Sequence, residues 1–101
     1  MRALLITPDA QSIETIEIAG LDEIKALIGF DTIASDAVGT AGDRLYFDEE
    51  CFLRSSSGRF QIDTLIPVAG RGVIVGTAGD GVTLSDAATQ IEDLGRRIKY
   101  Q

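Results

Sequence analysis

Five charged side chains in the middle of the chain have the clearest chemical potential: Asp48, Glu49, Glu50, Arg59 and Asp63. Paired carboxylates can act as general acid and general base, and a neighbouring arginine can hold an anionic group, which is sufficient for some hydrolases. The same residues could instead form an interaction surface or a ligand pocket. Sequence separation alone does not bring them together, so we assign no residue as catalytic.

The acidic run at 48–50 also raises the question of a metal site. A hard cation needs several converging oxygens, and the chain has no loop with calcium-binding spacing. With one cysteine and no histidine, a Cys/His zinc site, a histidine base and a Ser-His-Asp triad are excluded. We interpret Cys51 as a structural residue, and we predict no metal and no cofactor.

The hexapeptide VGTAGD occurs twice, at 38–43 and at 75–80. With Gly81, the second copy matches the glycine spacing of a phosphate-binding loop, but Val82 occupies the position where such a loop needs lysine. A duplicated unit would also repeat its flanking pattern, and the flanks differ. We therefore predict that both copies are turns: a strand ends at Val, the glycines adopt positive φ, and Asp bonds its own backbone.

The charge balance is acidic, with sixteen Asp and Glu against nine Lys and Arg and a net charge of −7. This excludes generic nucleic-acid binding, which depends on clustered cations. The only cationic cluster, Arg96, Arg97 and Lys99, suits the C-terminal end of a helix. No apolar run approaches the length of a membrane span. We expect a cytoplasmic protein whose acidic surface suits a protein partner, with no membrane contact.

The elements that must position these residues are strands for most of the chain, within a single domain over 1–101. RALLIT is apolar on both faces, which predicts a central strand, and GVIV is predicted to be a short, fully apolar strand. The expected strands lie at 2–7, 13–18, 30–38, 43–48, 59–65 and 72–75. Between the second and third, the apolar spacing predicts a helix over about 20–28, ended by Gly29.

A second helix is predicted over 85–98, where apolar residues recur at helical spacing. Thr83 and Asp86 fit a variant capping box. Glu92 with Arg96 and Asp93 with Arg97 are favourable i,i+4 pairs. Beyond Gly95, which weakens the helix interior, Ile98 and Tyr100 have no evident partner within the chain. We therefore predict a homodimer contact at this end.

Together these elements predict an α+β fold: a mostly antiparallel sheet of five to six strands with two helices. It begins with a β-grasp-like arrangement in which a hairpin is followed by a helix that covers one sheet face.

LYFDEE (45–50), the Gly58-Arg59 loop and PVAGRGVIVG (67–76), with RALLITPD and EIKALIG, give the chain a resemblance to a known family. It resembles small bacterial proteins classed only as a domain of unknown function and found often in phages and plasmids. Cys51 and Gly58 depart from the family pattern, which usually has Gly and Asn there. The resemblance implies an accessory role in a mobile element and carries over no catalytic residue.

We therefore predict a small, acidic, non-enzymatic interaction protein that binds a protein partner and acts as a phage or plasmid accessory. The alternative is a small carboxylate-dependent enzyme or ligand-binding domain built on Asp48, Glu50 or Asp63 with Arg59. A third reading is a structural subunit that works as a homo-oligomer.

Overall fold

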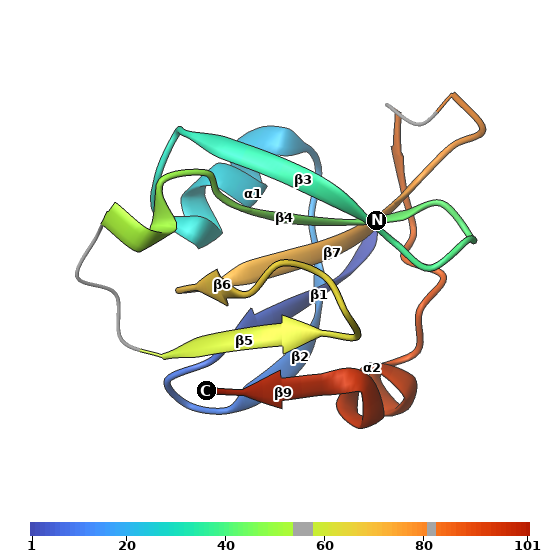
Figure 1. Ribbon diagram of the computed structural model, residues 1–101. Coiled ribbons are helices and arrows are strands. Elements are labelled where there is room, and N and C mark those ends of the chain that lie inside the picture. Colours follow the sequence, from blue (N-terminus) through green and yellow to red (C-terminus); the bar gives the residue numbers. More distant parts are fainter. Residues whose placement is uncertain (54–57, 81–82) are drawn as a thin grey trace.

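The computed structural model describes residues 1–53, 58–80 and 83–101, and it has three layers (Figure 1). In spatial order, the main sheet consists of β2 (Ser12–Glu17), β1 (Arg2–Thr7), β7 (Gly72–Thr77), β4 (Asp43–Asp48) and β3 (Ile33–Val38), with β8 (Leu84–Ser85) on β7. The smaller sheet consists of β6 (Val68–Ala69), β5 (Arg59–Ile62) and β9 (Ile98–Tyr100). The helices are α1 (Leu21–Ile28), the 3-10 turn η1 (Cys51–Leu53) and α2 (Ile91–Arg97).

Every strand pairing in the described residues is antiparallel. The predicted α+β class, the mostly antiparallel sheet and the opening hairpin and helix are therefore confirmed. The second small sheet was not foreseen. Within the described residues, no helix is long and apolar enough to cross a membrane.

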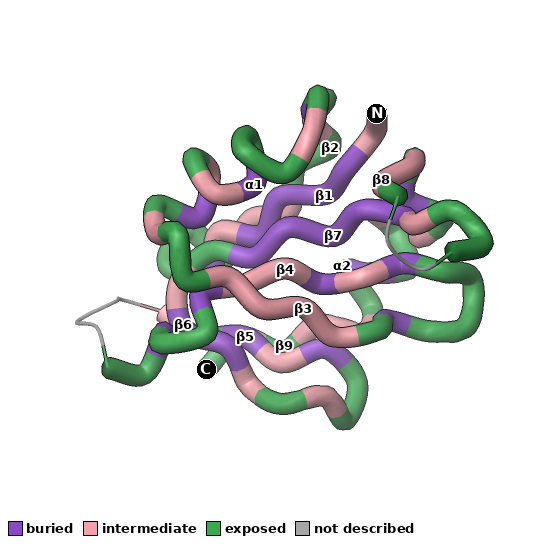
Figure 2. The backbone as a smooth tube through the Cα atoms, turned by 90° about the horizontal axis from the view of Figure 1, so that it is seen from above, coloured by how far each residue is buried: buried purple, intermediate pink, exposed green. Residues whose placement is uncertain are grey.

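The two central strands, β1 and β7, are buried on both faces, as their apolar sequences predict. They run side by side through the middle of the molecule (Figure 2) with Ala3 opposite Val75 and Leu4 opposite Ile74. Because successive side chains alternate between faces, Ala3 and Val75 belong to the core under α1. Leu4 and Ile74 belong to the core under the small sheet.

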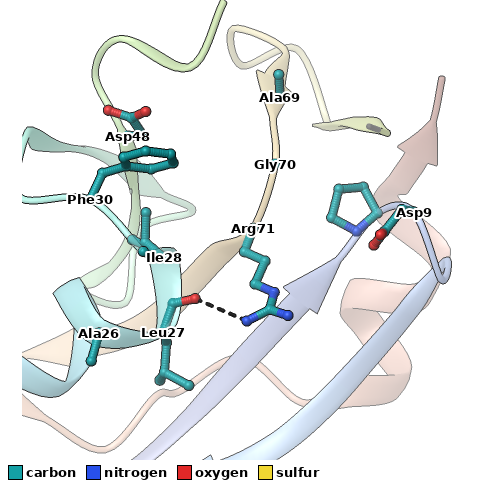
Figure 3. Close-up of a pocket in the computed structure, with 11 residues that line it drawn as sticks. Asp9, Ala26, Leu27, Ile28, Phe30, Asp48, Ala69, Gly70 and Arg71 are labelled. Atoms are coloured by element: carbon teal, nitrogen blue, oxygen red, sulfur yellow. Dashed lines mark hydrogen bonds between the residues drawn. The ribbon is translucent and has the colours of Figure 1, made fainter. Parts of the chain in front are cut away.

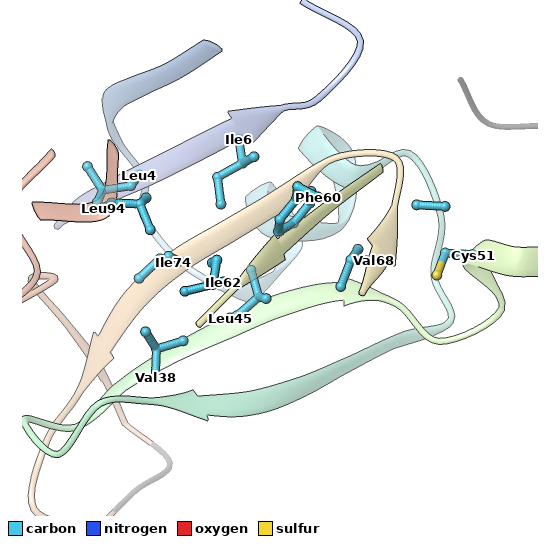
Figure 4. Packing of buried hydrophobic residues seen from close by; sticks show 11 residues of the cluster. Leu4, Ile6, Val38, Leu45, Cys51, Phe60, Ile62, Val68, Ile74 and Leu94 are labelled. Carbon is cyan, nitrogen blue, oxygen red and sulfur yellow. The ribbon is translucent and has the colours of Figure 1, made fainter. Parts of the chain in front are cut away.

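The main sheet therefore has a core on each face. The core under the small sheet is the larger, and Figure 4 shows its side chains converging between the sheets; among its buried members are Leu4, Ile6, Val38, Leu45, Phe60, Ile62, Val68, Ile74 and Leu94. On the other face, α1 buries Ile24 and Ile28 against the sheet. As predicted, α1 ends at Gly29, whose φ is +93° and whose amide donates to the Lys25 carbonyl at 2.8 Å.

The strand boundaries differ in detail from the predictions. β3 begins only at Ile33, after a turn in which the Ile33 amide donates to the Asp31 carbonyl at 2.9 Å. β5 ends at Ile62 rather than at 65, because Asp63 has φ +51° and turns the chain. β7 continues to Thr77 instead of ending at 75.

The predicted helix over 85–98 is the main error in the sequence-based assignment. α2 begins only at Ile91, and the segment before it is held against the main sheet. The Ala87 amide donates to the Arg2 carbonyl at 2.9 Å. The amides of Ala88 and Thr89 donate to the Asp43 carboxylate at 2.8 and 2.7 Å. These amides have acceptors across the fold, so they do not form a helical turn.

The side chains expected to support that helix also have other partners. Thr83 and Asp86 do not cap it: the Thr83 amide donates to Asp80 at 2.9 Å, and Asp86 accepts from the Arg2 amide at 2.7 Å. The i,i+4 ion pairs are replaced as well. Arg96 pairs with Asp93, and Arg97 pairs with Asp63 of the neighbouring sheet.

The chain end also differs from its prediction, because residues 98–100 form the strand β9 instead of the end of a helix that contacts a second chain. Ile98 lies opposite Ile62 and Tyr100 opposite Phe60, and both pack against the larger core. Burial raises the pKa of the Tyr100 phenol. The contact that motivated the predicted homodimer is thus made within the chain.

The two VGTAGD copies have different structures. The first forms the β3–β4 turn, with positive φ at Gly39 and Gly42 as predicted. Contrary to the prediction, its Asp43 does not bond the turn's own backbone but accepts from the amides of Ala88 and Thr89. In the second, Gly76 and Thr77 remain in β7, and neither Gly76 nor Gly79 has positive φ. The copies also touch, since the Thr77 amide and hydroxyl donate to the Gly42 carbonyl at 2.9 and 2.6 Å. For the second copy, the predicted strand end at Val75 and the predicted positive φ are therefore wrong. Asp80 does accept from the nearby Thr83 amide at 2.9 Å, as predicted for the Asp.

Candidate functional site

The acidic turn after β4 is built around the Asp48 carboxylate, which is 3% exposed. Its oxygen accepts from the Thr32 hydroxyl at 2.6 Å and from the Glu50 amide at 3.1 Å. The Glu49 amide donates to the Thr32 carbonyl at 2.6 Å. Asp48 thereby fixes the turn, while the side chains of Glu49 and Glu50 are exposed.

η1 follows this turn and presents two large apolar side chains to solvent. Cys51 is buried at its base, as its structural interpretation predicts, and its backbone is not left-handed. The Leu53 amide donates to the Glu50 carbonyl at 2.9 Å. Phe52 and Leu53 are nevertheless 53% and 84% exposed. The turn thus holds two adjacent apolar side chains out of the core.

Arg59, the first residue of β5, lies beside this turn. Its guanidinium carbon is 5.2 Å from the centroid of the Phe52 ring, within the range of a cation–π contact. We call Glu49, Glu50, Phe52, Leu53 and Arg59 the η1 surface. Three of the five sequence candidates therefore lie on one surface, and Asp48 supports it from below.

Asp63 is separated from this surface, because it follows the opposite end of β5 from Arg59. Its carboxylate accepts from Nε of Arg97 at 3.0 and 3.1 Å. This hydrogen bonding lowers the pKa of Asp63 and raises that of Arg97. Asp63 and Arg59 therefore do not share a cleft.

A small pocket of about 250 Å³ lies on the other side of Asp48 (Figure 3). Its rim carries Asp9 from the β1–β2 turn and Arg71 from the turn before β7. The Arg71 guanidinium donates to the Leu27 carbonyl near the end of α1 at 3.3 Å. Asp9 and Arg71 are not among the site residues predicted from the sequence. The only signal they give is a charged residue after Pro or Gly in a turn, which does not show that separate turns meet.

Within the described residues, no group of three or more His, Cys, Asp or Glu side chains could hold a metal ion. Comparisons of the chain with protein-family models, curated proteins and solved structures found no match. The resemblance to the phage and plasmid family remains a prediction.

Proposed function

We propose that this is a non-enzymatic interaction protein that binds another protein through the η1 surface. The observation that carries the proposal is the exposure of Phe52 and Leu53 on a turn fixed by hydrogen bonds and by buried Cys51. Burying an exposed leucine or phenylalanine contributes about 1.5–3 kcal/mol. A turn that is already fixed loses little conformational entropy on binding.

The charges around these side chains indicate the chemistry of the partner. Glu49 and Glu50 are exposed next to the apolar pair. Among the described residues, the cation beside them is Arg59, which faces the Phe52 ring. The whole chain carries a net charge of −7. A segment with an apolar anchor residue flanked by Lys or Arg would complement this surface and would be attracted from a distance.

The contacts of the carboxylates give less support to the enzyme alternative. Asp48 is buried and accepts from the turn that it fixes, and Asp63 is paired with Arg97. A general acid or base has to reach a substrate. We therefore include no catalytic step in the proposal.

Two further parts of the proposal come from the sequence. An accessory role in a phage or plasmid follows from the family resemblance, and gene neighbourhood tests it. A cytoplasmic location is proposed with it, and cell fractionation tests that.

The test is a selection from a displayed library of random short peptides, followed by affinity measurements on the selected peptides. We expect selected peptides to combine an aromatic or aliphatic residue with Lys or Arg, and to bind more weakly as salt is raised. Leu53→Ser should lower the affinity of these peptides about tenfold, which is equivalent to roughly 1.4 kcal/mol.

Ile66→Ser is the matched control, because Ile66 is also aliphatic and 69% exposed but lies in the loop before β6. It should leave peptide affinity unchanged. The proposal is overturned if the selected peptides are neutral or acidic, or if they bind the Leu53→Ser protein as well as the original.

A further inference from the structure

A groove beside α1 forms a second candidate site, which shares no lining residue with the η1 surface. α1 packs over β1 and β7, while the same face of the main sheet continues across β4 and β3. There a groove of about 570 Å³ lies between the start of α1 and β8. This volume falls within the range of about 300–1,000 Å³ that is common for small-molecule sites.

The walls of the groove are largely apolar. Leu21, the first residue of α1, is 43% exposed, and Leu84 of β8 is half-buried on the opposite side. Ile33 and Tyr46, from the neighbouring strands β3 and β4, form the floor and are also half-buried. These four side chains could all bury more apolar surface against a ligand.

The cation in the groove is Arg44, which is half-buried and oriented by Ser35. Its Nε donates to the Ser35 hydroxyl at 2.9 Å, and its Nη2 donates to the Ser35 carbonyl at 3.0 Å. Both acceptors are uncharged, and within the described chain Arg44 forms no ion pair. The positive charge is therefore positioned but not neutralised by a carboxylate.

We propose that this groove binds a small amphipathic carboxylate, with the carboxylate on Arg44 and the apolar body along Leu21, Ile33 and Tyr46. A guanidinium matches the planar, two-oxygen geometry of a carboxylate. The net charge of −7 opposes polyanions at long range, whereas one negative charge is tolerated. The groove volume accommodates one small molecule.

The test is calorimetric titration of the full chain with octanoate below its micelle-forming concentration, with octanol as the uncharged comparison. Arg44→Gln should lower the affinity for octanoate about tenfold or more, because it removes a charge-assisted hydrogen bond. Arg96→Gln makes the same change at an exposed site on α2 and should leave affinity unchanged. Octanol should bind more weakly than octanoate and should be insensitive to Arg44→Gln.

Leu21→Glu provides a second variant if Arg44→Gln does not fold. Leu21 is partly exposed at the start of α1, where an acidic residue is compatible with the helix dipole. The new carboxylate should repel octanoate and lower its affinity at least about tenfold. The proposal is overturned if octanoate does not bind at millimolar concentration, if octanol binds equally well, or if the folded variants retain full affinity.

Discussion

Because VGTAGD occurs twice, the same substitution can be made in identical local sequence at two positions with different backbone conformation and packing. Gly39 and Gly76 are the second residues of the two copies. Gly39 has φ +68°, and nothing lies within 4 Å of where its Cβ would be. Gly76 has no positive φ, but its Cβ would lie 2.1 Å from the Asp86 carbonyl oxygen. Alanine should therefore cause backbone strain at Gly39 and a steric clash at Gly76.

The structure gives the size of each effect. The left-handed backbone costs a side chain about 1 kcal/mol, so Gly39→Ala should destabilise by that amount. At Gly76, the Asp86 carbonyl must move by about 1 Å to reach normal contact. The Asp86 carboxylate accepts a hydrogen bond from the Arg2 amide at 2.7 Å, and the Ala87 amide donates to the Arg2 carbonyl at 2.9 Å. Overpacking and the weakening of these hydrogen bonds together should make Gly76→Ala about 3 kcal/mol less stable than the original protein.

Urea unfolding of the two alanine variants and two asparagine variants separates these mechanisms. Asparagine tolerates the left-handed conformation better than alanine, so Gly39→Asn should recover part of the loss. Gly76→Asn should be at least as destabilising as Gly76→Ala, because it is larger. A loss of about 3 kcal/mol lowers the unfolding midpoint by roughly 1 M urea or more. The reasoning is refuted if Gly76→Ala stays within about 0.5 kcal/mol of the original, or if asparagine is better than alanine at Gly76.

Three other predictions follow from the contacts. Asp43→Ala should destabilise by about 2–4 kcal/mol, because it removes the acceptor of the amides at 88–89; unchanged thermal unfolding would contradict it. Asparagine, like aspartate, can adopt the positive φ at position 63, so Asp63→Asn should lower the free energy of unfolding by at most about 1 kcal/mol at neutral pH. Since Arg97 lowers the Asp63 pKa below 3.8, this difference should persist above that pH and vanish as pH falls through the lowered pKa; a difference retained in acid, measured by urea unfolding, would refute it. Deleting 98–101 should unfold or strongly destabilise the protein by circular dichroism, since β9 pairs with β5; a folded product of unchanged stability would show that β9 is dispensable.

The candidate site was only partly accessible from sequence. The acidic turn at 48–50 was identified, and Arg59 does lie beside it on the η1 surface. The sequence gives no signal that Phe52 and Leu53 are exposed, because large apolar side chains are normally buried. Their exposure follows from Cys51 alone pointing into the core. Asp63 is a candidate partner of Arg59 by residue type, but the strand β5 places the two residues at opposite ends.

The sequence by itself determined the elements whose signal is local. Apolar residues on both faces made β1 and β7 central, and apolar spacing with Gly29 bounded α1. Tertiary structure decided the residues whose backbone had a choice of partners. Residues 85–90 have helical spacing, yet their amides bond to Arg2 and Asp43, which are remote in sequence. Residues 98–100 became a strand because the edge of β5 offered hydrogen bonds and the core offered burial. Local sequence carries no information about such acceptors, because the rest of the fold has to bring them into place.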